Sequence, residues 1–483
     1  MRQTPLTVVV LAAGEGTRMK SSTGRPKVLH AFAGRSLLGH VLAAARPLAA
    51  EDTVVVVGHG REQVTAHLVD IAPHAHIAVQ DEQLGTGDAV RVALETSPQR
   101  VGQVLVLPGD APVLATETLA ALLAEHESSG AAATVLTSTL ADPTGYGRVL
   151  RDSAGRVARI VEQPDATAAE LAVAEVGTSV YAFDEALLRD AVLRLSTDNA
   201  QGEQYLTDVV AVLVADGRPV GALQAPAEQT AGVNDRVQLA AAHRAYNARL
   251  LEAHMRAGVT VVDPATTWVD ADVRLAPDVT LHPSVQLRGA TSADEGAVIG
   301  PQTTLTDTTV GARSCLERVV ARAATVGADV TVGPFAYLRA GTVLADGVHV
   351  GTYVELKNSE VGAGSKVPHL SYVGDATIGA HVNIGAGTVF VNYDGVSKHR
   401  SVIGDHARTG ADNMFVAPVH VGDGAYTAAG SVITDDVPPG ALGVARAPQH
   451  NVAGWVRRKR PGTPAADAAA RAEAAPSSED ETH

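Results

Sequence analysis

The chain has 483 residues, of which 46% are apolar and only 3% aromatic, and it carries a net charge of −15 at pH 7. This length predicts two or three domains, and the acidic balance argues against general nucleic-acid binding, which requires clustered Lys and Arg. The single cysteine, Cys315, excludes a disulfide framework and a multi-cysteine metal site, and the absence of a secretory signal or of eighteen consecutive apolar residues predicts a cytoplasmic protein without a membrane span.

The first half of the chain alternates strand-like and helix-like segments. Runs of β-branched residues occupy residues 6–14, 53–60, 103–110 and 131–140, and helical patterns occupy residues 36–49 and 86–97. This alternation predicts a parallel sheet with helices on both faces. Ligands of such folds bind at the carboxyl ends of the strands, where the stretches LAAGEGTRM and LPGDAP fall.

Three elements in this half favour phosphate binding. Gly14 and Gly16 directly follow the first strand, in a turn that is neither a Walker loop nor a dinucleotide fingerprint. Lys27 follows in the stretch RPKVLH, and Asp110 ends a strand, where a carboxylate can hold Mg²⁺. Taken singly, these elements have plainer interpretations: a structural turn, a solvated lysine and a capped loop carboxylate. Their occurrence in this order makes phosphate handling the better prediction.

The pattern changes after residues 235–256, which predict one long helix that ends at Gly258 and joins two domains. Beyond it, aliphatic residues recur every six positions and are often followed by glycine, which is typical of a parallel β-helix of hexapeptide repeats. The positions with this spacing form four runs: Val326, Val332, Leu338, Leu344, Val350 and Leu356; Val361, Val367 and Val373; Ile378, Ile384 and Phe390; and Ile403, Thr409, Phe415, Val421, Thr427 and Ile433, with weaker echoes at Val273, Val279 and Val285. Each hexad predicts one short flat of a three-sided coil with a narrow interior.

The stretch GAGTVFVNYDGVSKHRSVIG, residues 385–404, interrupts this repeat. Phe390 and Ile403 are thirteen residues apart, one more than two hexads, and polar residues lie between them. The surplus predicts a loop extruded from the coil, which supplies the concavity that a small-molecule site needs. A purely structural loop is the alternative. At the end of the chain, a composition rich in Ala, Pro and acidic residues predicts a disordered tail.

The motifs of the first half resemble the sugar-1-phosphate nucleotidyltransferase family. They are LAAGEGTRM, RPKVLH, QLGTGDAV, PGDAPVL, TGYGRVL, RIVEQPDA, NAQGEQYLTD and GVNDR. Followed by a coil that carries VPHLSYVGDATIGAHVNIGAGT and NYDG, they are similar to the bifunctional members of that family over residues 6–456. The resemblance implies an α/β nucleotidyltransferase domain of Rossmann-like type and a left-handed parallel β-helix. The expected division is 1–234 for uridylyl transfer, 235–257 for a linker helix, 258–456 for acetyl transfer and 457–483 for the disordered tail.

The resemblance implies two reactions for cell-wall precursor synthesis. Glucosamine-1-phosphate is acetylated by acetyl-CoA, and UMP then passes from UTP to N-acetylglucosamine-1-phosphate to give UDP-N-acetylglucosamine and pyrophosphate. The residues implied for UTP and UDP-N-acetylglucosamine are Leu11, Ala12, Ala13, Gly14, Lys27, Gln80, Gly85, Thr86, Gly147, Glu162 and Asn234. The implied cofactor is Mg²⁺, with Asp110 and Asn234 as its ligands.

The implied acetyl-transfer site centres on His369, in VPHLSY. Transfer of an acetyl group from a thioester to an amine requires a proton acceptor, which an imidazole provides, although a lone histidine is more often structural. By the resemblance, the sugar phosphate is bound by Arg339, Lys357, Tyr372 and Asn383, and acetyl-CoA by Ala386, Asn392, Tyr393, Ala411, Ala429 and Arg446. Glu355 is a further candidate for orienting His369, with a rim carboxylate as the alternative.

Four positions depart from the family pattern. Glu15 stands where a basic residue is common, and Asp88 stands where His is frequent. Gly177 replaces an Asn that contacts the sugar, and Ala411 replaces a Ser that contacts acetyl-CoA. The flat flanks of a narrow coil predict association, so we expect a homotrimer with the acetylation site between subunits. The alternative is a single-activity NDP-sugar pyrophosphorylase with a structural coil, which explains neither His369 nor NYDG.

Overall fold

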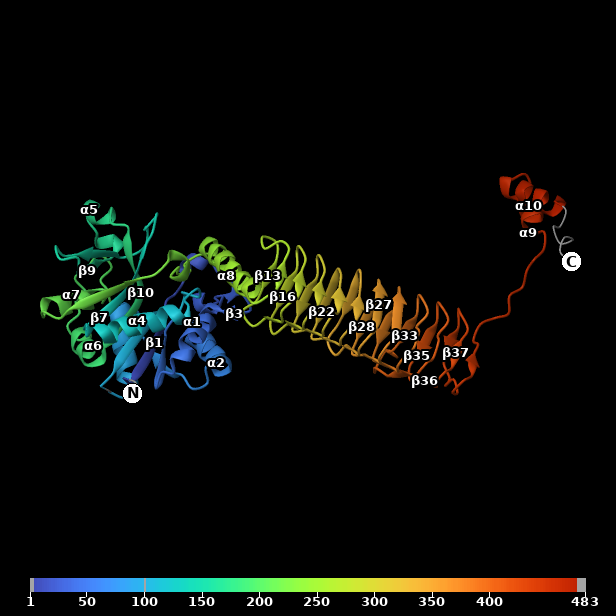
Figure 1. The fold of residues 1–483 in the computed structure, drawn as a ribbon, viewed down its shortest axis with the longest axis horizontal. Helices are drawn as coiled ribbons and strands as arrows, with labels where there is room; N and C mark the ends of the chain where they lie inside the picture. The colour runs from blue at the N-terminus through green and yellow to red at the C-terminus, as the bar shows by residue number, and fades with distance from the viewer. Residues whose placement is uncertain (1–3, 100, 476–483) are drawn as a thin grey trace. The chain divides into compact units, whose positions relative to one another are not determined.

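The computed structural model describes residues 4–99 and 101–475 (Figure 1). The chain divides into two compact units, residues 1–347 and 348–483. Unit 1 contains an α/β domain, a long helix and a first series of coils. Unit 2 contains a second series of coils and two short helices. Within the described ranges, no helix is both long and apolar enough to cross a bilayer.

The α/β domain is built on a nine-stranded sheet of order β11-β7-β10-β6-β1-β4-β5, with β8 paired to β10 and β9 paired to β8. Its strands are β1 (Leu6–Ala12), β4 (Asp52–Val57), β5 (His76–Val79), β6 (Gln103–Pro108), β7 (Ala133–Thr139), β8 (Arg148–Arg151), β9 (Val157–Val161), β10 (Glu175–Asp184) and β11 (Val220–Gln224). The expected parallel pairing holds for β1 with β4 and β6, but β10 is antiparallel to both of its neighbours, β6 and β7. The sheet is therefore mixed, because a buried apolar run has the same pattern in either strand direction.

Side chains of the central strands alternate between two cores, one on each face of the sheet. On β1, Val9 enters the first core, whereas Val8 and Val10 enter the second. The first core is closed by α3 (Thr86–Thr96), α6 (Glu185–Val192) and α7 (Asp208–Ala215), and the second by α1 (Leu37–Ala45), α2 (Arg61–Ile71) and α4 (Thr116–Ser129). The remaining short elements of the domain are β2 (Ala31–Phe32), β3 (Arg35–Ser36), α5 (Ala168–Leu171), η1 (Thr17–Met19), η2 (Lys27–Leu29), η3 (Arg46–Leu48), η4 (Gln163–Asp165) and η5 (Ala227–Gln229). Cover on both faces fixes the strand ends that carry the loops.

The predicted long helix is α8 (Arg236–Arg256). The Asp235 carboxylate caps its start by accepting from the backbone amides of Val237 and Gln238 over 2.9 and 2.8 Å. Midway along the helix, the buried Asn247 side chain donates to the Thr267 carbonyl oxygen over 2.8 Å and accepts from the Val269 amide over 3.0 Å. One amide thus attaches the helix to the first coil.

The first coils, in unit 1, are made of short strands on three flats. The strands are β12 (Thr260–Val261), β13 (Trp268–Val269), β14 (Arg274–Leu275), β15 (Thr280–Leu281), β16 (Gln286–Arg288), β17 (Ser292–Ala293), β18 (Val298–Ile299), β19 (Thr304–Thr306), β20 (Thr309–Val310), β21 (Cys315–Leu316), β22 (Val319–Arg322), β23 (Thr325–Val326), β24 (Thr331–Val332), β25 (Ala336–Leu338) and β26 (Val343–Leu344). Each strand pairs in parallel with the strand three places later, as β12 does with β15. This is the arrangement of a left-handed parallel β-helix.

Unit 2 repeats the same architecture. Its strands are β27 (His349–Thr352), β28 (Glu355–Lys357), β29 (Glu360–Val361), β30 (Lys366–His369), β31 (Tyr372–Gly374), β32 (Ala376–Ile378), β33 (Val389–Val391), β34 (Ser401–Ile403), β35 (Met414–Val416), β36 (Val419–Val421), β37 (Tyr426–Thr427), β38 (Val432–Ile433) and β39 (Leu442–Gly443). Every in-phase position predicted from the hexads is buried, in both units. The hexapeptide prediction is therefore confirmed.

Two features of unit 2 stand outside the repeat. The predicted loop leaves the coil after β33, where Tyr393 is 55% exposed and Val396 is 88% exposed. The predicted disordered tail is wrong for α9 (Trp455–Lys459) and α10 (Pro464–Ala474). The reason is local, because the Thr463 side chain caps α10, Pro464 stands at its first position, and alanine, the strongest helix former, fills much of its length. The rest of that prediction, residues 476–483, lies outside the described residues.

Candidate functional site

The parallel order of β4, β1 and β6 brings three loops to one edge of the sheet. Residues 13–19, 58–63 and 109–112 follow the carboxyl ends of these strands. The His59 amide donates to the Ala13 carbonyl oxygen over 3.1 Å, so the first two loops are joined directly. This edge is where ligands bind in open α/β sheets.

The predicted nucleotide loop starts inside the sheet. Leu11 and Ala12 end β1, and Ala13 and Gly14 follow. The Gly109 amide donates to the Leu11 carbonyl oxygen over 2.8 Å, which fixes the loop from the β6 side. These residues offer a ligand only backbone groups and small side chains, so charge must come from elsewhere.

That charge comes from Lys27, and Gly16 allows its approach. Gly16 has a φ of 67°, and a Cβ there would lie 2.6 Å from the Lys27 Cβ. A side chain at this position is therefore excluded by backbone conformation and by space. Lys27 begins η2, and its ammonium forms an ion pair with the Asp110 carboxylate and donates to the Asn234 Oδ1 over 3.2 Å.

Asp110 and Asn234, the predicted metal ligands, therefore meet at the Lys27 ammonium. Arg18, from η1, also donates to the Asn234 Oδ1, over 2.9 Å. A carboxylate and an amide oxygen are ligands that Mg²⁺ accepts, and two of them suit an ion that keeps other positions for water and phosphate. In residues 4–99 and 101–475 there is no group of three His, Cys, Asp or Glu side chains that could hold a metal.

A cavity of about 650 Å³ next to the nucleotide loop is lined by Gln80 and by Glu15. The Gln80 amide donates to the Gly85 carbonyl oxygen over 3.0 Å and to the Asp88 Oδ2 over 2.8 Å. Asp88 is buried and paired with Arg91. The departure at Asp88 is thus compensated within the protein, whereas the departure at Glu15 places a carboxylate at the cavity wall.

Gly85 and Thr86 form the start of α3. The Thr86 hydroxyl accepts from the Leu206 amide over 3.0 Å, and the Gly87 amide donates to the Gln204 carbonyl oxygen over 2.7 Å. The helix start is therefore held against residues far along the chain. One of the first backbone amides of α3, that of Gly87, is thereby used within the protein.

A smaller cavity, of about 160 Å³, continues from the metal-ligand pair. It contains the predicted residues Gly147 and Glu162 together with Gly177. A Cβ on Gly177 would lie 3.6 Å from the Ile160 side chain and 4.0 Å from the Tyr181 hydroxyl. Those are ordinary contact distances, so the departure leaves room for a side chain that the chain does not have.

Glu162 is the main polar group of this smaller cavity. Burial raises the pKa of its carboxyl group, while the hydrogen bond from the Thr207 hydroxyl, over 3.2 Å, works in the opposite direction. The nearby Asp208 carboxylate raises this pKa further. A desolvated carboxyl beside a cavity of this size is suited to accept or donate a hydrogen bond to a sugar hydroxyl.

In unit 2, the predicted acetyl-transfer residues occupy neighbouring coils. Lys357 ends β28, His369 ends β30 and Tyr372 begins β31. Asn383 forms a parallel bridge with Lys366, the first residue of β30. Glu355 and Tyr372 are register partners, so the suggested orienting carboxylate lies one coil from Tyr372. Arg339 lies in unit 1, in the turn between β25 and β26.

His369 itself is exposed and has Thr352 as its register partner. One coil away, His349 pairs in register with Lys366. Burial lowers the pKa of His349, and the positive charge of Lys366 lowers it further. The imidazole of His369 is therefore open to substrate, and its surroundings already carry positive charge.

The extruded loop begins at Asn392 and is closed at its base. The His399 amide donates to the Asn392 carbonyl oxygen over 2.8 Å, and Tyr393 and Lys398 form an antiparallel bridge. The Asp394 carboxylate accepts from the His399 ring over 2.7 Å and from two backbone amides of the turn. The loop is a short structured hairpin, with the Tyr393 ring exposed.

The predicted acetyl-CoA residues outside the loop lie on successive coils. They are Ala386, Ala411, Ala429 and Arg446. The Ala386 carbonyl oxygen accepts from the Asp412 amide over 2.6 Å, and the Ala411 carbonyl oxygen accepts from the Gly430 amide over 2.9 Å. A column of methyl groups results, with an arginine at its end. At Ala411 this column lacks the hydroxyl that the family pattern has there.

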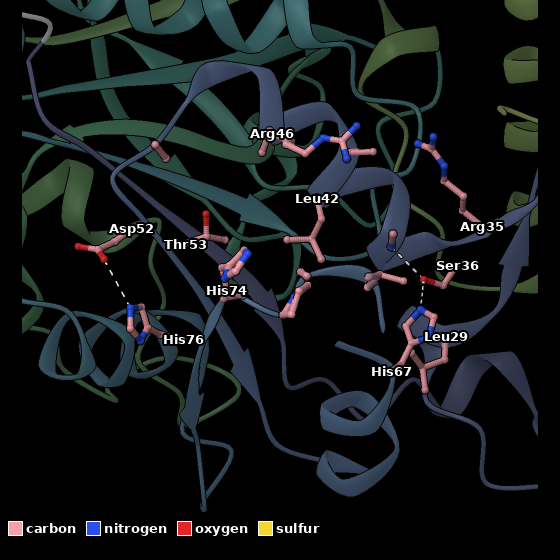
Figure 2. A pocket seen from close by; sticks show the side chains of 18 of the residues that line it. Leu29, Arg35, Ser36, Leu42, Arg46, Asp52, Thr53, His67, His74 and His76 are labelled. Atoms are coloured by element: carbon pink, nitrogen blue, oxygen red, sulfur yellow. Dashed lines mark hydrogen bonds and ion pairs between the residues drawn. The ribbon is translucent and has the colours of Figure 1, made fainter. Parts of the chain in front are cut away.

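A further cavity, of about 910 Å³, lies at the opposite edge of the sheet, where β4 and β5 begin (Figure 2). Figure 2 shows Ser36 beside His67 and Asp52 beside His76, with separations of 2.8 and 3.5 Å. This cavity is larger than the two at the carboxyl ends of the strands, but it contains none of the predicted nucleotide or sugar residues. Volume alone therefore does not identify an active site.

Sequence reasoning missed three polar residues at these sites. Arg18 stands inside a quoted motif, so its charge was visible, but not its contact with Asn234. Asp375 also stands inside a quoted motif, where a Gly-Asp pair reads as an ordinary corner of the coil. His349 shares no motif, and only the coil register places it beside Lys366.

Comparison with known proteins extends these observations to the whole chain. Residues 7–271 match the family model described as nucleotidyl transferase. The chain is 59% identical over 479 residues to the bifunctional protein GlmU of Streptomyces avermitilis, covering 99% of each chain. It is 61% identical over 475 residues to the bifunctional protein GlmU of Thermobifida fusca, covering 97% of this chain and 98% of that one, and 55% identical over 465 residues to that of Mycolicibacterium vanbaalenii. Relatives of this identity and coverage, together with the family model, show that the chain belongs to the family of bifunctional GlmU enzymes.

Proposed function

We propose that this enzyme acetylates glucosamine-1-phosphate with acetyl-CoA and then transfers UMP from UTP to the N-acetylglucosamine-1-phosphate so formed. The observation that carries the proposal is the presence in one chain of two chemically different sites. One is the Lys27, Asp110 and Asn234 cluster beside the sugar-sized cavity, and the other is His369 with its hairpin on the coil. We assign residues 1–234 to uridylyl transfer, 235–257 to a linker helix and 258–456 to acetyl transfer.

In uridylyl transfer, a phosphate oxygen of the sugar attacks the α-phosphorus of UTP in line. The new P–O bond forms as the bridging bond to the β-phosphate breaks, and pyrophosphate leaves. The protein forms no covalent bond, so its residues act by position and charge. Lys27 neutralises phosphate charge, the amides at Gly14 and at the start of α3 orient the nucleotide, and Glu162 holds the sugar.

Mg²⁺ is the cation we propose for this site, with Asp110 and Asn234 as its protein ligands. When bound, it neutralises the charge on the phosphates and stabilises the leaving pyrophosphate. The oxygen donors beside the sugar cavity support this assignment. For the ion to bind there, the Lys27 ammonium must leave the Asp110 carboxylate, and the phosphates of the nucleotide give it a new partner.

In acetyl transfer, the amine of glucosamine-1-phosphate attacks the thioester carbonyl carbon. A C–N bond forms, the C–S bond breaks, and the His369 imidazole accepts the proton that the amine loses. The thiolate of CoA leaves and is protonated. Lys357 binds the phosphate of the substrate, Tyr372 and Asn383 bind its sugar ring, and the hairpin with Tyr393 lies by the acetyl group.

We also propose a homotrimer in which the acetyl-transfer site is completed by a second copy of the chain. Tyr353 and Leu370 follow register partners on β27 and β30, and they are 58% and 64% exposed. Leu370 directly follows His369, so an apolar surface of this kind at a subunit contact would add a wall next to the imidazole. Sedimentation of the active enzyme as a stable monomer would contradict this assembly.

One coupled assay tests the function. The purified protein is mixed with glucosamine-1-phosphate, acetyl-CoA, UTP and Mg²⁺, and UDP-N-acetylglucosamine is measured by chromatography and mass spectrometry. We expect product in the full mixture, no product without acetyl-CoA, and product again when N-acetylglucosamine-1-phosphate replaces the first two compounds. Product only in the last mixture would support the single-activity alternative, and no product in any mixture would contradict both readings.

A further inference from the structure

The carboxylate of Asp375 joins two predicted substrate-binding residues that lie on different coils. The Lys357 ammonium lies 3.3 and 3.1 Å from its Oδ1 and Oδ2. The Asn392 side-chain amide donates to the Oδ2, and the Asn358 side-chain amide donates to the Oδ1 over 2.6 Å. Three donors from two segments of the chain, residues 357–358 and Asn392, therefore converge on one carboxylate.

Burial makes this arrangement specific. Only 7% of Asp375 and 8% of Asn392 are exposed. Although burial works to raise it, the pKa of Asp375 is held below its ordinary value by the hydrogen bonds from Asn358, Lys357 and Asn392. An ionised carboxylate only accepts hydrogen bonds and has capacity for all three donors. An amide in its place would turn a donor toward at least one of them, and a buried donor without an acceptor is costly.

The backbone around this carboxylate is built to bring the groups together. A Cβ on Gly374, the residue before Asp375, would lie 2.5 Å from the Tyr372 hydroxyl oxygen and 2.7 Å from the Asn392 Nδ2. Only glycine leaves that space, so Tyr372 and Asn392 both pack against position 374. The backbone of Asp375 is held without its side chain, because its amide donates to the Lys357 carbonyl oxygen over 2.9 Å. This backbone hydrogen bond between neighbouring coils does not depend on the carboxylate.

We propose that Asp375 is a positioning residue of the acetyl-transfer site, whose carboxylate fixes the Lys357 ammonium and the base of the hairpin at Asn392 relative to each other. This inference rests on the proposed function, in which Lys357 binds the sugar phosphate and the hairpin lies by the acetyl group. The ammonium has three N–H donors, so the pairing with Asp375 leaves capacity for phosphate. One carboxylate thereby couples the sugar end of the site to the acetyl end.

The test uses the full-length enzyme with Asp375→Asn, a change that keeps the size of the side chain and removes its charge and one acceptor. We expect the KM for glucosamine-1-phosphate to rise and the kcat for acetyl transfer to fall, each by about tenfold, as expected when hydrogen bonds to a charged group are lost. Uridylyl transfer by the same preparation should be unchanged. Asp405→Asn is the matched control, because Asp405 is an exposed coil carboxylate that accepts from the Ala380 amide over 2.7 Å.

A double-mutant cycle separates positioning from simple support of the fold. If Asp375 acts through the hairpin, the effects of Asp375→Asn and Asn392→Ala on kcat should be strongly less than additive. Asn358→Ala, which removes one donor and leaves the carboxylate, should give the same kinetic signature at smaller size, and it serves if Asp375→Asn does not fold.

The outcomes distinguish this inference from the proposed function. A wild-type enzyme that acetylates, together with unchanged kinetics in Asp375→Asn or equal losses in Asp405→Asn, would overturn the inference alone. Additive effects in the cycle would also overturn it. A wild-type enzyme that does not acetylate glucosamine-1-phosphate would overturn the proposed function, and the inference with it.

Discussion

The two candidate sites each contain a lysine–aspartate ion pair, but the surroundings of the two carboxylates differ. In unit 1, the side chains of Lys27 and Asp110 are 14% and 20% exposed, and the Lys27 ammonium donates to the Asp110 carboxylate. In unit 2, the side chains of Lys357 and Asp375 are 17% and 10% exposed, and three side-chain donors converge on the carboxylate.

This difference shows that a pair of residue types does not define a role. A carboxylate with few protein donors beside a cavity can exchange its lysine for a metal ion, so Asp110 is suited to be a ligand. A carboxylate saturated by protein donors cannot exchange them cheaply, so Asp375 is suited to be a support. The number of competing donors, and not the ion pair, decides between the two roles.

The largest expected effects come from removing one chemical group from each site. Asp110→Ala should lower uridylyl transfer by about a thousandfold or more, because metal stabilisation of phosphate charge is worth several kcal/mol. His369→Ala should lower acetyl transfer by about 10²- to 10⁴-fold, the usual contribution of a general base. Each variant should retain the other activity, as measured by separate assays of the two half-reactions.

The comparison depends on this independence. Circular dichroism spectra recorded before and after the activity assays establish whether each variant is folded. If folded Asp110→Ala and folded His369→Ala each lost both activities, the two lysine–aspartate pairs would not belong to separate sites.

The histidines of the two units also differ, since His369 is exposed whereas His40 is buried against Phe32 and Tyr246. Burial lowers the pKa of His40 from 6.5 to about 4. The unfolded chain therefore binds a proton that the folded chain excludes, so the contribution of His40 to stability is complete above pH 6.5 and is lost as the pH drops from 6.5 to 4. The loss should be on the order of 3 kcal/mol in the free energy of unfolding.

Trp268 reports on this region, because its ring packs on His243 of α8 next to Phe32. Urea unfolding can be followed by its fluorescence in a Trp455→Phe background at pH 7 and pH 4.5. His40→Gln should flatten the pH dependence, and His74→Gln, at an exposed histidine of the same unit, should not. An equally steep loss in His40→Gln would refute the assignment.

A third prediction sharpens the role of Asp110 as an exchangeable carboxylate. In the absence of nucleotide, the Lys27 ammonium occupies the oxygen donors and competes with a cation. Lys27→Met should therefore bind Mn²⁺ about tenfold more tightly than the wild type, because a nearby like charge is removed. Electron paramagnetic resonance of free Mn²⁺ measures this, and Lys20→Met is the control at an exposed lysine of the same loop. Unchanged Mn²⁺ affinity would place the cation elsewhere.

The smallest expected effect is at Gly177, where the sugar cavity has room for a side chain. Gly177→Asn should lower the KM for N-acetylglucosamine-1-phosphate about three- to tenfold, the range of one added hydrogen bond. Gly177→Ala fills part of the same space without a polar group and should leave the KM near its wild-type value. A higher KM in the Asn variant would mean that the space is needed by the substrate.

The six-residue periodicity predicted the coil in detail because each flat requires a buried side chain at the same position of its hexad. The residues from Val326 to Ile433 needed only the six-residue spacing to be placed inside. The sheet was predicted less completely, since burial on both faces hides strand direction, and β10 turned out antiparallel. The tail was mispredicted because composition was weighed there above the local cap at Thr463.

The site residues divide in the same way. Motifs identified Lys27, Asp110 and His369, whose chemistry is apparent from the side chain alone. They did not identify Asp375 as a contact of Lys357 and Asn392, since that contact depends on coil register and on the hairpin leaving the coil at one point. A residue whose role depends on contacts with distant segments of the chain could not be predicted from the sequence alone.

The hairpin after Asn392 has a consequence for how such an enzyme can change. The hexapeptide repeat continues from Ile403, which is buried inside the coil. Phe390 and Phe415, before and after the hairpin, pack against each other in the interior with ring centroids 5.1 Å apart. An insertion at one corner therefore leaves the packing of the neighbouring coils unchanged. At the proposed acetyl-transfer site, exchanging the exposed turn from Tyr393 to Lys398 would therefore change the residues next to the acetyl group while the coil keeps its shape.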